Sequence, residues 1–343
     1  MKKLTKQIAS VVLALAMTFA LTACGSKNSG ESGEKQQVTR VKMGMVLSAT
    51  SQWYPFAEQF ASLIKERTNG AYEIDIYPSD SLAGGSLAKS IENIQNNVAQ
   101  IQWTSPLNLN SMDQRLAVFG LPWLISSTDQ ADAIRENMMD DFRDICADNG
   151  IYLLAMGEAG YRQLSNNVHP VSTPEDLKGL SIRVPGVPMY VSMFKLLGAD
   201  PVSIDFSELY DALQKHTIDG QENALATMAG NKIEEVQKYV TMWNYSYDPF
   251  FCMLNPDFWN SLNAETQEIF ATTAAEVLDA QIKDYRATEL EFRKSFEEKG
   301  VQFTDLTAEQ LEAFKEAAAP LYDEYESIVG ADLMSKVRSY EVK

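Results

Sequence analysis

Residues 41–78 read VKMGMVLSATSQWYPFAEQFASLIKERTNGAYEIDIYP. The run Val41–Leu47 predicts a strand, and Pro55–Gly70 predicts an amphipathic helix that ends at a glycine. Ala71–Pro78 alternates apolar and polar residues, which is typical of a second strand. Because the order strand, helix, strand produces parallel strands with covering helices, this stretch predicts an α/β fold with a parallel sheet.

The same alternation continues along the chain. Ala264–Glu298 keeps apolar residues at helical spacing and predicts one long helix, longer than one small domain needs. Thr173 and Thr307 each stand where a side chain can cap a new helix. Roughly 305 residues follow residue 38. Because a single hydrophobic core seldom supports a chain of this length, we expect two domains. The other predicted helices are Leu87–Val98, Val191–Gly198 and Phe206–Gln214, and the other strands are Ala99–Ser105, Gly150–Gly160 and Leu180–Val184.

The segment Thr217–Asn223, TIDGQEN, interrupts this alternation with polar residues. Asp-Gly is a strong turn signal, and an acid and two amides follow it directly. We therefore expect a turn that carries polar side chains at this point, rather than a strand.

The first residues indicate export. Lys2, Lys3 and Lys6 precede an apolar run that is shorter than a membrane span and ends in LTAC at Cys24. Residues 1–23 are therefore predicted to be a lipoprotein signal peptide, because LTAC resembles a bacterial lipobox. Cys24 would carry the lipid, and residues 24–38, rich in small and polar residues, would form a flexible stalk. The alternative is an ordinary signal peptide with an incidental cysteine.

Composition limits the partners of the chain. The formal net charge of −18 and the lack of a clustered basic face argue against nucleic acid. A small anion stays open, because a buried arginine can govern its own pocket despite distant surface charges. Cys146 and Cys252 are too few for a disulfide framework and are expected to be buried thiols, with a single bridge as the alternative.

Catalytic patterns are missing from the sequence. The chain has two histidines, His169 and His216, and neither belongs to a metal-binding or triad-like motif. A nucleophile elbow, a phosphate loop and a dinucleotide-binding glycine motif are also lacking. We therefore expect no enzyme activity, no cofactor and no metal site.

Two arginines suggest binding instead. Arg162 follows a predicted strand and its glycines, and Arg183 lies within the apolar strand SIRV, where a charge needs a partner. A guanidinium at such a place can hold a carboxylate through two parallel charge-assisted bonds. The sequence leaves open whether Arg183 binds a ligand or pairs with an internal acid such as Glu222.

Longer motifs resemble the solute-binding proteins of TRAP transporters, the DctP family typified by the C4-dicarboxylate-binding protein. The likeness covers nearly all of residues 40–300, with the motifs in the family order. They are YPFAEQFASLIKERTNG, YPSDSLAGG, FGLPWLISSTDQADAI, GYRQLSNN, TPEDLKGLSIRVPG, LLGADPVSIDFSELYDALQKHTIDGQENALATM, VQKYVTMWNYSYDPF and FWNSLNAETQE.

The resemblance implies a two-lobed α/β binding protein of the periplasmic-binding-protein type, with a hinge and a long helix that spans both lobes. On this basis we expect lobe I to comprise residues 39–158 and 248–285. Lobe II would comprise residues 159–247 and 286–343. The ligand would lie between the lobes.

The resemblance also implies the binding residues. Arg183 matches the family arginine that pairs with the ligand carboxylate, Arg162 a supporting arginine, and Asn223 an amide that contacts the same carboxylate. Ser86 follows Gly85 where the family has an acid, which puts the commonest mode of sugar-acid binding in doubt. Further candidates for lining the cleft are Tyr54, Ser86, Trp103, Phe206 and Tyr245, with core packing as the alternative for the aromatic residues.

The expected function is therefore a lipid-anchored extracytoplasmic receptor. It would capture a small monocarboxylate, dicarboxylate or sugar acid and present it to the TRAP permease subunits in the membrane. Two other functions stay open: a sensor of the same fold for a membrane signalling partner, and a secreted enzyme on a binding-protein scaffold.

Overall fold

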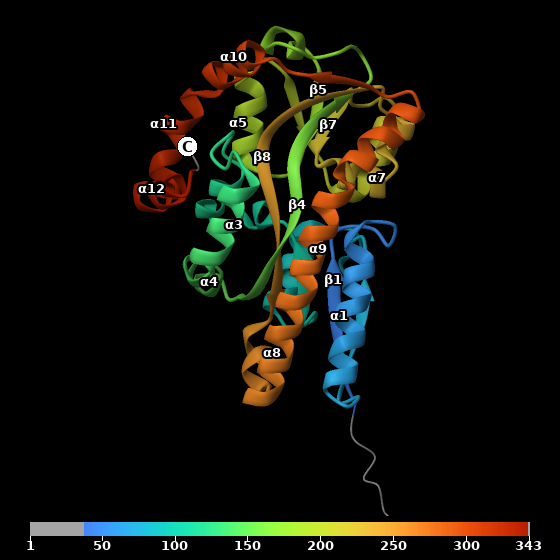
Figure 1. The fold of residues 1–343 in the computed structure, drawn as a ribbon, viewed down its shortest axis with the longest axis vertical. Coiled ribbons are helices and arrows are strands. Elements are labelled where there is room, and N and C mark those ends of the chain that lie inside the picture. Colours follow the sequence, from blue (N-terminus) through green and yellow to red (C-terminus); the bar gives the residue numbers. More distant parts are fainter. Residues whose placement is uncertain (1–37, 342–343) are drawn as a thin grey trace, which may run out of the picture. The chain divides into compact units, whose positions relative to one another are not determined.

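The computed structural model describes residues 38–341, so the signal peptide, residue Cys24 and the stalk up to residue 37 lie outside the described residues. Strand β1 (Thr39–Met45), helix α1 (Trp53–Arg67) and strand β2 (Tyr72–Tyr77) form the predicted strand–helix–strand unit. β1 pairs in parallel with β2 on one side and with β3 (Ile101–Thr104) on the other (Figure 1).

The strands form one mixed sheet in the order β2-β1-β3-β8-β4-β7-β5-β6, and β9 also pairs with β8. The prediction of a parallel sheet is correct at both ends and wrong in the middle, where β3–β8, β4–β8 and β4–β7 are antiparallel. The reason is that two long strands, of 15 and 16 residues, run through the whole sheet in opposite directions. These strands are β4 (Tyr152–Asn166) and β8 (Tyr239–Leu254), and the others are β5 (Ser181–Val184), β6 (Asp200–Ser203), β7 (Gly220–Asn223) and β9 (Gln302–Asp305).

Helix α9 has the predicted bounds, Ala264–Glu298, and contains 35 residues. Asn263 caps its first turn through a side-chain oxygen that accepts from the Thr266 amide at 2.8 Å. Thr307 caps α10 in a capping box with Gln310, as predicted, whereas the capping box of Thr173 opens only a short 3₁₀ turn. The other helices are α2 (Leu87–Gln95), α3 (Thr128–Asn137), α4 (Met139–Asp148), α5 (Pro188–Leu196), α6 (Leu209–Gln214), α7 (Leu225–Gly230), α8 (Pro256–Ser261), α10 (Ala308–Ala318), α11 (Pro320–Val329) and α12 (Ala331–Ser339).

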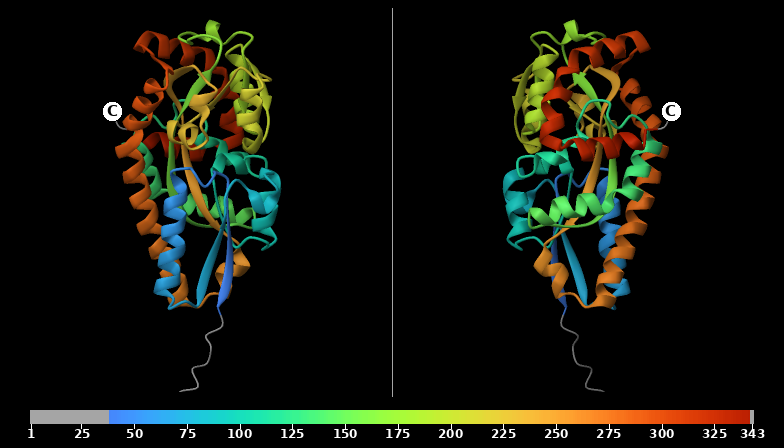
Figure 2. Two further views of the ribbon diagram at one scale, coloured as in Figure 1. Left: turned by 90° about the vertical axis from the view of Figure 1, so that its right-hand side faces the viewer. Right: turned by 90° about the vertical axis from the view of Figure 1, so that its left-hand side faces the viewer.

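The long helix belongs to two cores, as a helix that spans both lobes must. Near its start, Phe270 packs with residues of α1, β1 and β3. Near its end, Phe296 packs with residues of α6, α7 and β8. Between them, α9 runs along β4 in both views (Figure 2). No helix within residues 38–341 is long and apolar enough to cross a membrane.

The segment TIDGQEN bends at residues 217–219, but Gly220–Asn223 form a strand, β7, so the expectation of a turn rather than a strand is wrong for these four residues. Glu222 is fully buried, and Gln221 is fully buried as well. Buried polar side chains are tolerated in this strand because neighbouring strands satisfy them; the Gln221 amide, for example, donates to Ser165 Oγ at 2.8 Å. Gly220 is needed for close approach, since a Cβ there would lie 2.2 Å from the Ser165 carbonyl oxygen.

Cys146 and Cys252 are both buried and unpaired, as expected. Burial raises the pKa of each thiol to about 12. The two residues therefore contribute to packing, and a disulfide between them does not form.

Candidate functional site

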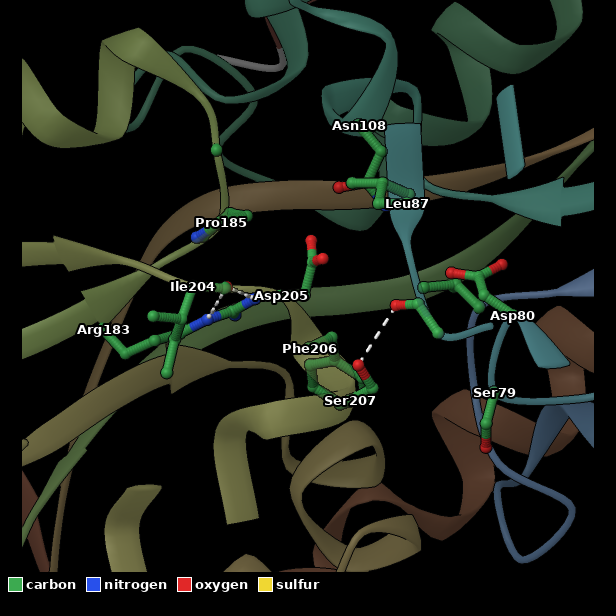
Figure 3. Close-up of a pocket in the computed structure, with 13 residues that line it drawn as sticks. Ser79, Asp80, Leu87, Asn108, Arg183, Pro185, Ile204, Asp205, Phe206 and Ser207 are labelled. Atoms are coloured by element: carbon green, nitrogen blue, oxygen red, sulfur yellow. Dashed lines mark hydrogen bonds between the residues drawn. The ribbon is translucent and has the colours of Figure 1, made fainter. Parts of the chain in front are cut away.

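The candidate site lies where β4 and β8 cross from one half of the sheet to the other. An inner cavity of about 50 Å³ is lined by Trp53, Ser105, Arg162, Arg183, Asn223 and Asp248, among others. A middle pocket of about 30 Å³ adjoins it and is lined by Asp80, Asn108, Arg183, Asp205, Phe206 and Ser207, among others (Figure 3). Asn108, Arg183 and Phe206 line both, so the two spaces adjoin each other.

Arg162 is held by the protein itself. Its Nε donates to Glu222 Oε2 at 2.5 Å, and its Nη1 donates to Asp248 Oδ2 at 2.5 Å. Its Nη2 reaches Asn223 Oδ1 at 2.9 Å. Burial opposes the charge, but the field of Glu222 keeps the pKa of Arg162 well above its ordinary value. Two carboxylates thus already neutralise this guanidinium, which braces β4 against β7 and β8.

Glu222 therefore pairs with Arg162. The alternative that it pairs with Arg183 is wrong, because no salt bridge joins those two side chains. Glu222 also accepts a hydrogen bond from Tyr245 Oη at 2.5 Å. Asp248, on the other side of Arg162, accepts a hydrogen bond from Ser105 Oγ at 2.5 Å.

Arg183 has a different environment. Its side chain lies in β5 and is 3% exposed, yet none of the salt bridges among residues 38–341 includes it. Nε and Nη2 donate to one carbonyl oxygen, that of Ile204, at 3.0 and 2.9 Å. The guanidinium also lies 5.7 Å from the centre of the Phe206 ring. Within the described residues, Nη1 makes no hydrogen bond.

The charge on Arg183 persists at neutral pH. Burial lowers its pKa to about 10, which still leaves the guanidinium protonated. A buried cation is costly unless an anion accompanies it. Arg183 therefore offers the cavity a charged donor that the described part of the chain does not neutralise with a direct ion pair.

Asn223 orients Arg162 and faces the inner cavity. Its Oδ1 accepts from Arg162, and its Nδ2 donates to Gln221 Oε1 at 2.7 Å. An amide nitrogen has two N–H groups, and Gln221 takes one of them. The second can serve a ligand.

Of the eight residues predicted to bind the ligand, Arg162, Arg183, Asn223 and Phe206 line the two spaces. Trp103 and Tyr245 do not. Trp103 is fully buried and packs against Phe250, with ring centres 5.1 Å apart. Tyr245 is also fully buried, beneath Glu222. Core packing, the alternative for these aromatic residues, describes both positions.

Tyr54 and Ser86 lie beside the lining residues. Trp53, one residue before Tyr54, lines the inner cavity and packs on Phe250 at 4.1 Å between ring centres. Ser86 caps α2 by accepting from the Lys89 amide, while its neighbours Gly85 and Leu87 line the middle pocket.

Sequence reasoning missed several polar lining residues, among them Asp80, Asp205, Asn108 and Ser105. Asp80 follows β2 in the motif YPSD, so a charge shortly after a predicted strand was the available signal. Asp205 follows β6 in the motif SIDF, but the sequence analysis did not predict that strand. Asn108 and Ser105 follow β3 and had no distinguishing pattern.

Comparison with known proteins identifies the family of this site. The model of bacterial extracellular solute-binding proteins, family 7 (DctP), matches residues 43–328. The chain belongs to this family. Similar proteins include the ectoine/5-hydroxyectoine-binding periplasmic protein UehA of Ruegeria pomeroyi, 32% identical over 80% of this chain and 81% of the relative. The 2,3-diketo-L-gulonate-binding periplasmic protein YiaO of Escherichia coli is 28% identical over 84% of this chain and 88% of the relative.

Solved structures agree with the DctP assignment. A TRAP periplasmic solute-binding protein from Ralstonia eutropha with bound (S)-2-acetolactate superposes with a TM-score of 0.85 at 32% identity, over 88% of this chain and 98% of the other. A protein of the same description from Sulfurospirillum deleyianum with bound succinate gives a TM-score of 0.83 at 25% identity, over 88% and 99%. The two-lobed α/β fold expected from the sequence is therefore confirmed.

Proposed function

We propose that this chain is the extracytoplasmic receptor of a TRAP transporter and captures a small organic acid by pairing its carboxylate with Arg183. The observation that carries the proposal is a buried guanidinium at a cavity wall, 3% exposed and without a carboxylate partner in the described chain. A ligand carboxylate supplies the missing anion, through charge-assisted hydrogen bonds of the strong class.

The ligands named for the similar structures support this proposal. Acetolactate, succinate and the galactonate bound by a protein from Advenella mimigardefordensis are all carboxylates. A receptor for any of them needs one cation in a fixed position to bind the carboxylate, and other side chains contact the part of the ligand that differs. In this chain Arg183 has the fixed role, while Arg162 and Asn223 support it.

The two lobes would close on the ligand about the crossing of β4 and β8. We propose lobe boundaries at residues 158/159, 247/248 and 285/286, close to the crossing and to the contact of α9 with β4. Gln281 of α9 joins this contact, since its side chain bonds the backbone of Glu158 at 3.0 and 2.8 Å. Closure is favoured by as much as the ligand binds the closed state better than the open one.

Anchoring and delivery complete the proposed function. Cys24 would carry a lipid after removal of residues 1–23, and residues 24–38 would tether the binding domain to the outer face of the membrane. From there the receptor would deliver its ligand to the TRAP permease subunits without chemical change.

A thermal-shift screen of the lipid-free chain, Ser26 onward, tests the proposal. Organic acids are compared with their amides and with neutral sugars. A ligand that binds only the folded state stabilises it by about 2.7 kcal/mol at a hundredfold excess over the dissociation constant. The melting temperature rises with an acid and not with its amide. A shift by neutral compounds alone would show that the pocket does not recognise a carboxylate.

A further inference from the structure

The middle pocket carries two acidic side chains opposite Arg183. Asp80, from the loop after β2, and Asp205, from the loop after β6, both line it. In Figure 3, Arg183 lies on one side of the pocket and Asp80 on the other, with the carboxylate of Asp205 between them. No lysine, histidine or further arginine lines this pocket among the described residues.

Asp80 is the more informative of the two carboxylates because it is buried. It is 4% exposed, and its Oδ1 accepts a hydrogen bond from Gln102 Nε2 at 3.1 Å. Within residues 38–341 it has no salt bridge. Burial raises the pKa of Asp80, and the neighbouring carboxylate of Asp205 adds to the effect. An adjacent cation would relieve this cost.

The backbone holds Asp80 in this position firmly. Ser79 and Asp80 both adopt the left-handed conformation, with φ of 55° and 48°, which few residues other than glycine adopt. Their amides donate to the carbonyl oxygens of Leu47 and Met45 at 2.9 and 3.0 Å, which fixes the loop against β1. The carboxylate is thus presented to the pocket by a rigid segment.

The approach to the pocket is acidic as well. An outer groove of about 680 Å³ shares Asn108 and Asp205 with the middle pocket and is also lined by Glu92 and Glu208. Among the described residues that line the groove, none is basic. A second carboxylate on a ligand would therefore meet acidic side chains along the groove and in the pocket, and like charges brought together at a binding site are strongly disfavoured.

We infer that the ligand is a zwitterion: a small acid with one carboxylate at Arg183 and a positively charged, ammonium-type group toward Asp80 and Asp205. This inference rests on the proposed function and adds the chemistry of the distal end. It excludes dicarboxylates as the preferred ligands. The volumes of about 50 and 30 Å³ accommodate a compound of a few heavy atoms, since a single water needs about 10–15 Å³ on this scale.

Titration calorimetry with a nearly isosteric series tests the inference. The series is butanoate, 4-hydroxybutanoate, 4-aminobutanoate and succinate, repeated with chains one carbon shorter and one carbon longer. These compounds share the carboxylate and differ at the distal end. At the chain length that binds best, the aminated acid should bind at least about tenfold more tightly than the dicarboxylate. The reason is that the acidic side chains attract its ammonium group and repel the second carboxylate of the dicarboxylate.

Variants of the acidic residues locate the effect. Asp80→Asn and Asp205→Asn should each lower the affinity for the aminated acid by about tenfold. The ratio of its affinity to that for the dicarboxylate should therefore become smaller. Asp205 is exposed, so its replacement leaves folding intact even where Asp80→Asn does not. Asp200→Asn is the matched control, because Asp200 is an exposed acid of β6 that lines neither the inner cavity, nor the middle pocket, nor the outer groove. This substitution should leave the affinity for every acid unchanged.

The outcomes separate this inference from the proposed function. If the dicarboxylate, the hydroxy acid or a larger acid without a cationic group binds more tightly than the aminated acid, the ligand is not a zwitterion. The proposal of a carboxylate receptor is unaffected by that result. Equal binding of an aminated acid and its amide, 4-aminobutanamide for example, overturns both, because the carboxylate then has no role.

Discussion

Arg183 should cost the protein stability in the absence of a ligand. Burial lowers the pKa of Arg183 to about 10, so the unfolded chain holds this proton more tightly than the folded protein does. The unfavourable contribution is complete at every pH below the lowered pKa and fades as the pH rises through it. Replacing Arg183 with methionine, an unbranched and uncharged side chain that ends about where the Arg183 Nε lies, should therefore stabilise the ligand-free protein.

The magnitude follows from the pKa. A depression of between two and three pH units corresponds to about 3 kcal/mol, at about 1.4 kcal/mol per unit. The substitution also leaves the Ile204 carbonyl without its donor, which costs about 1 kcal/mol. Arg183→Met should therefore raise the free energy of unfolding by about 2 kcal/mol while abolishing carboxylate binding.

Urea unfolding of the lipid-free chain, followed by tryptophan fluorescence, measures the effect. The increase should be the same at pH 6 and pH 8, because both lie below the lowered pKa of Arg183. Lys195→Met is the matched control, since Lys195 is exposed and its side chain makes no hydrogen bond or ion pair within the described residues. If Arg183→Met lowers stability by more than about 1 kcal/mol while the control is neutral, the chain itself compensates the charge and the argument fails.

Three further predictions concern residues around the site. Glu222→Gln leaves the buried Arg162 short of a carboxylate and should lower the free energy of unfolding in urea by about 3–5 kcal/mol, so a loss below about 1 kcal/mol would refute the brace. Gly160→Ala should destabilise by at least about 1–3 kcal/mol, because φ is +100° and a Cβ would lie 1.8 Å from Tyr285 Oη; a thermal melt like that of the native chain would contradict this close contact. Cys252 is fully buried, with a pKa raised to about 12, and should react with a thiol reagent at pH 8 only after unfolding, whereas fast labelling of the native protein would show that it is accessible.

Local patterns predicted several helices of this fold, including the longest, but not α3, α4, α7, α8, α11 or α12. The bounds of α9 follow from apolar spacing and from a cap at Asn263, both of which involve residues close in sequence. The long strands were predicted less well. Gly160 suggested that β4 ends there, but the strand continues to Asn166, and the glycine is present because Tyr285 of α9 packs against it. That reason lies 125 residues away and has no local signal.

The buried strand β7 shows the same limit. Three consecutive polar residues suggest solvent exposure, yet Gln221 and Glu222 are fully buried because Ser165 and Arg162 of β4 satisfy them. Sequence reasoning could identify both arginines as candidates from their place beside strands. Only geometry distinguishes the one with two carboxylate partners from the one with none.

Neighbouring residues in a helix show a finer limit. Sequence patterns could not distinguish Trp53 from Tyr54 as a residue of the cleft wall, and only Trp53 lines the inner cavity. The packing of α1 on β1 and β3 fixes which of its side chains point there. An error of one residue turns a side chain by about 100° around a helix of 3.6 residues per turn.

The central claim is that Arg183 binds the carboxylate of the ligand. A crystal structure of the lipid-free chain with the acid that stabilises it most tests this directly. A carboxylate oxygen should lie about 2.7–2.9 Å from a guanidinium nitrogen of Arg183, the range of charge-assisted hydrogen bonds. A bound acid whose carboxylate contacts other groups, with Arg183 facing a neutral part of the ligand or no part of it, would contradict the account.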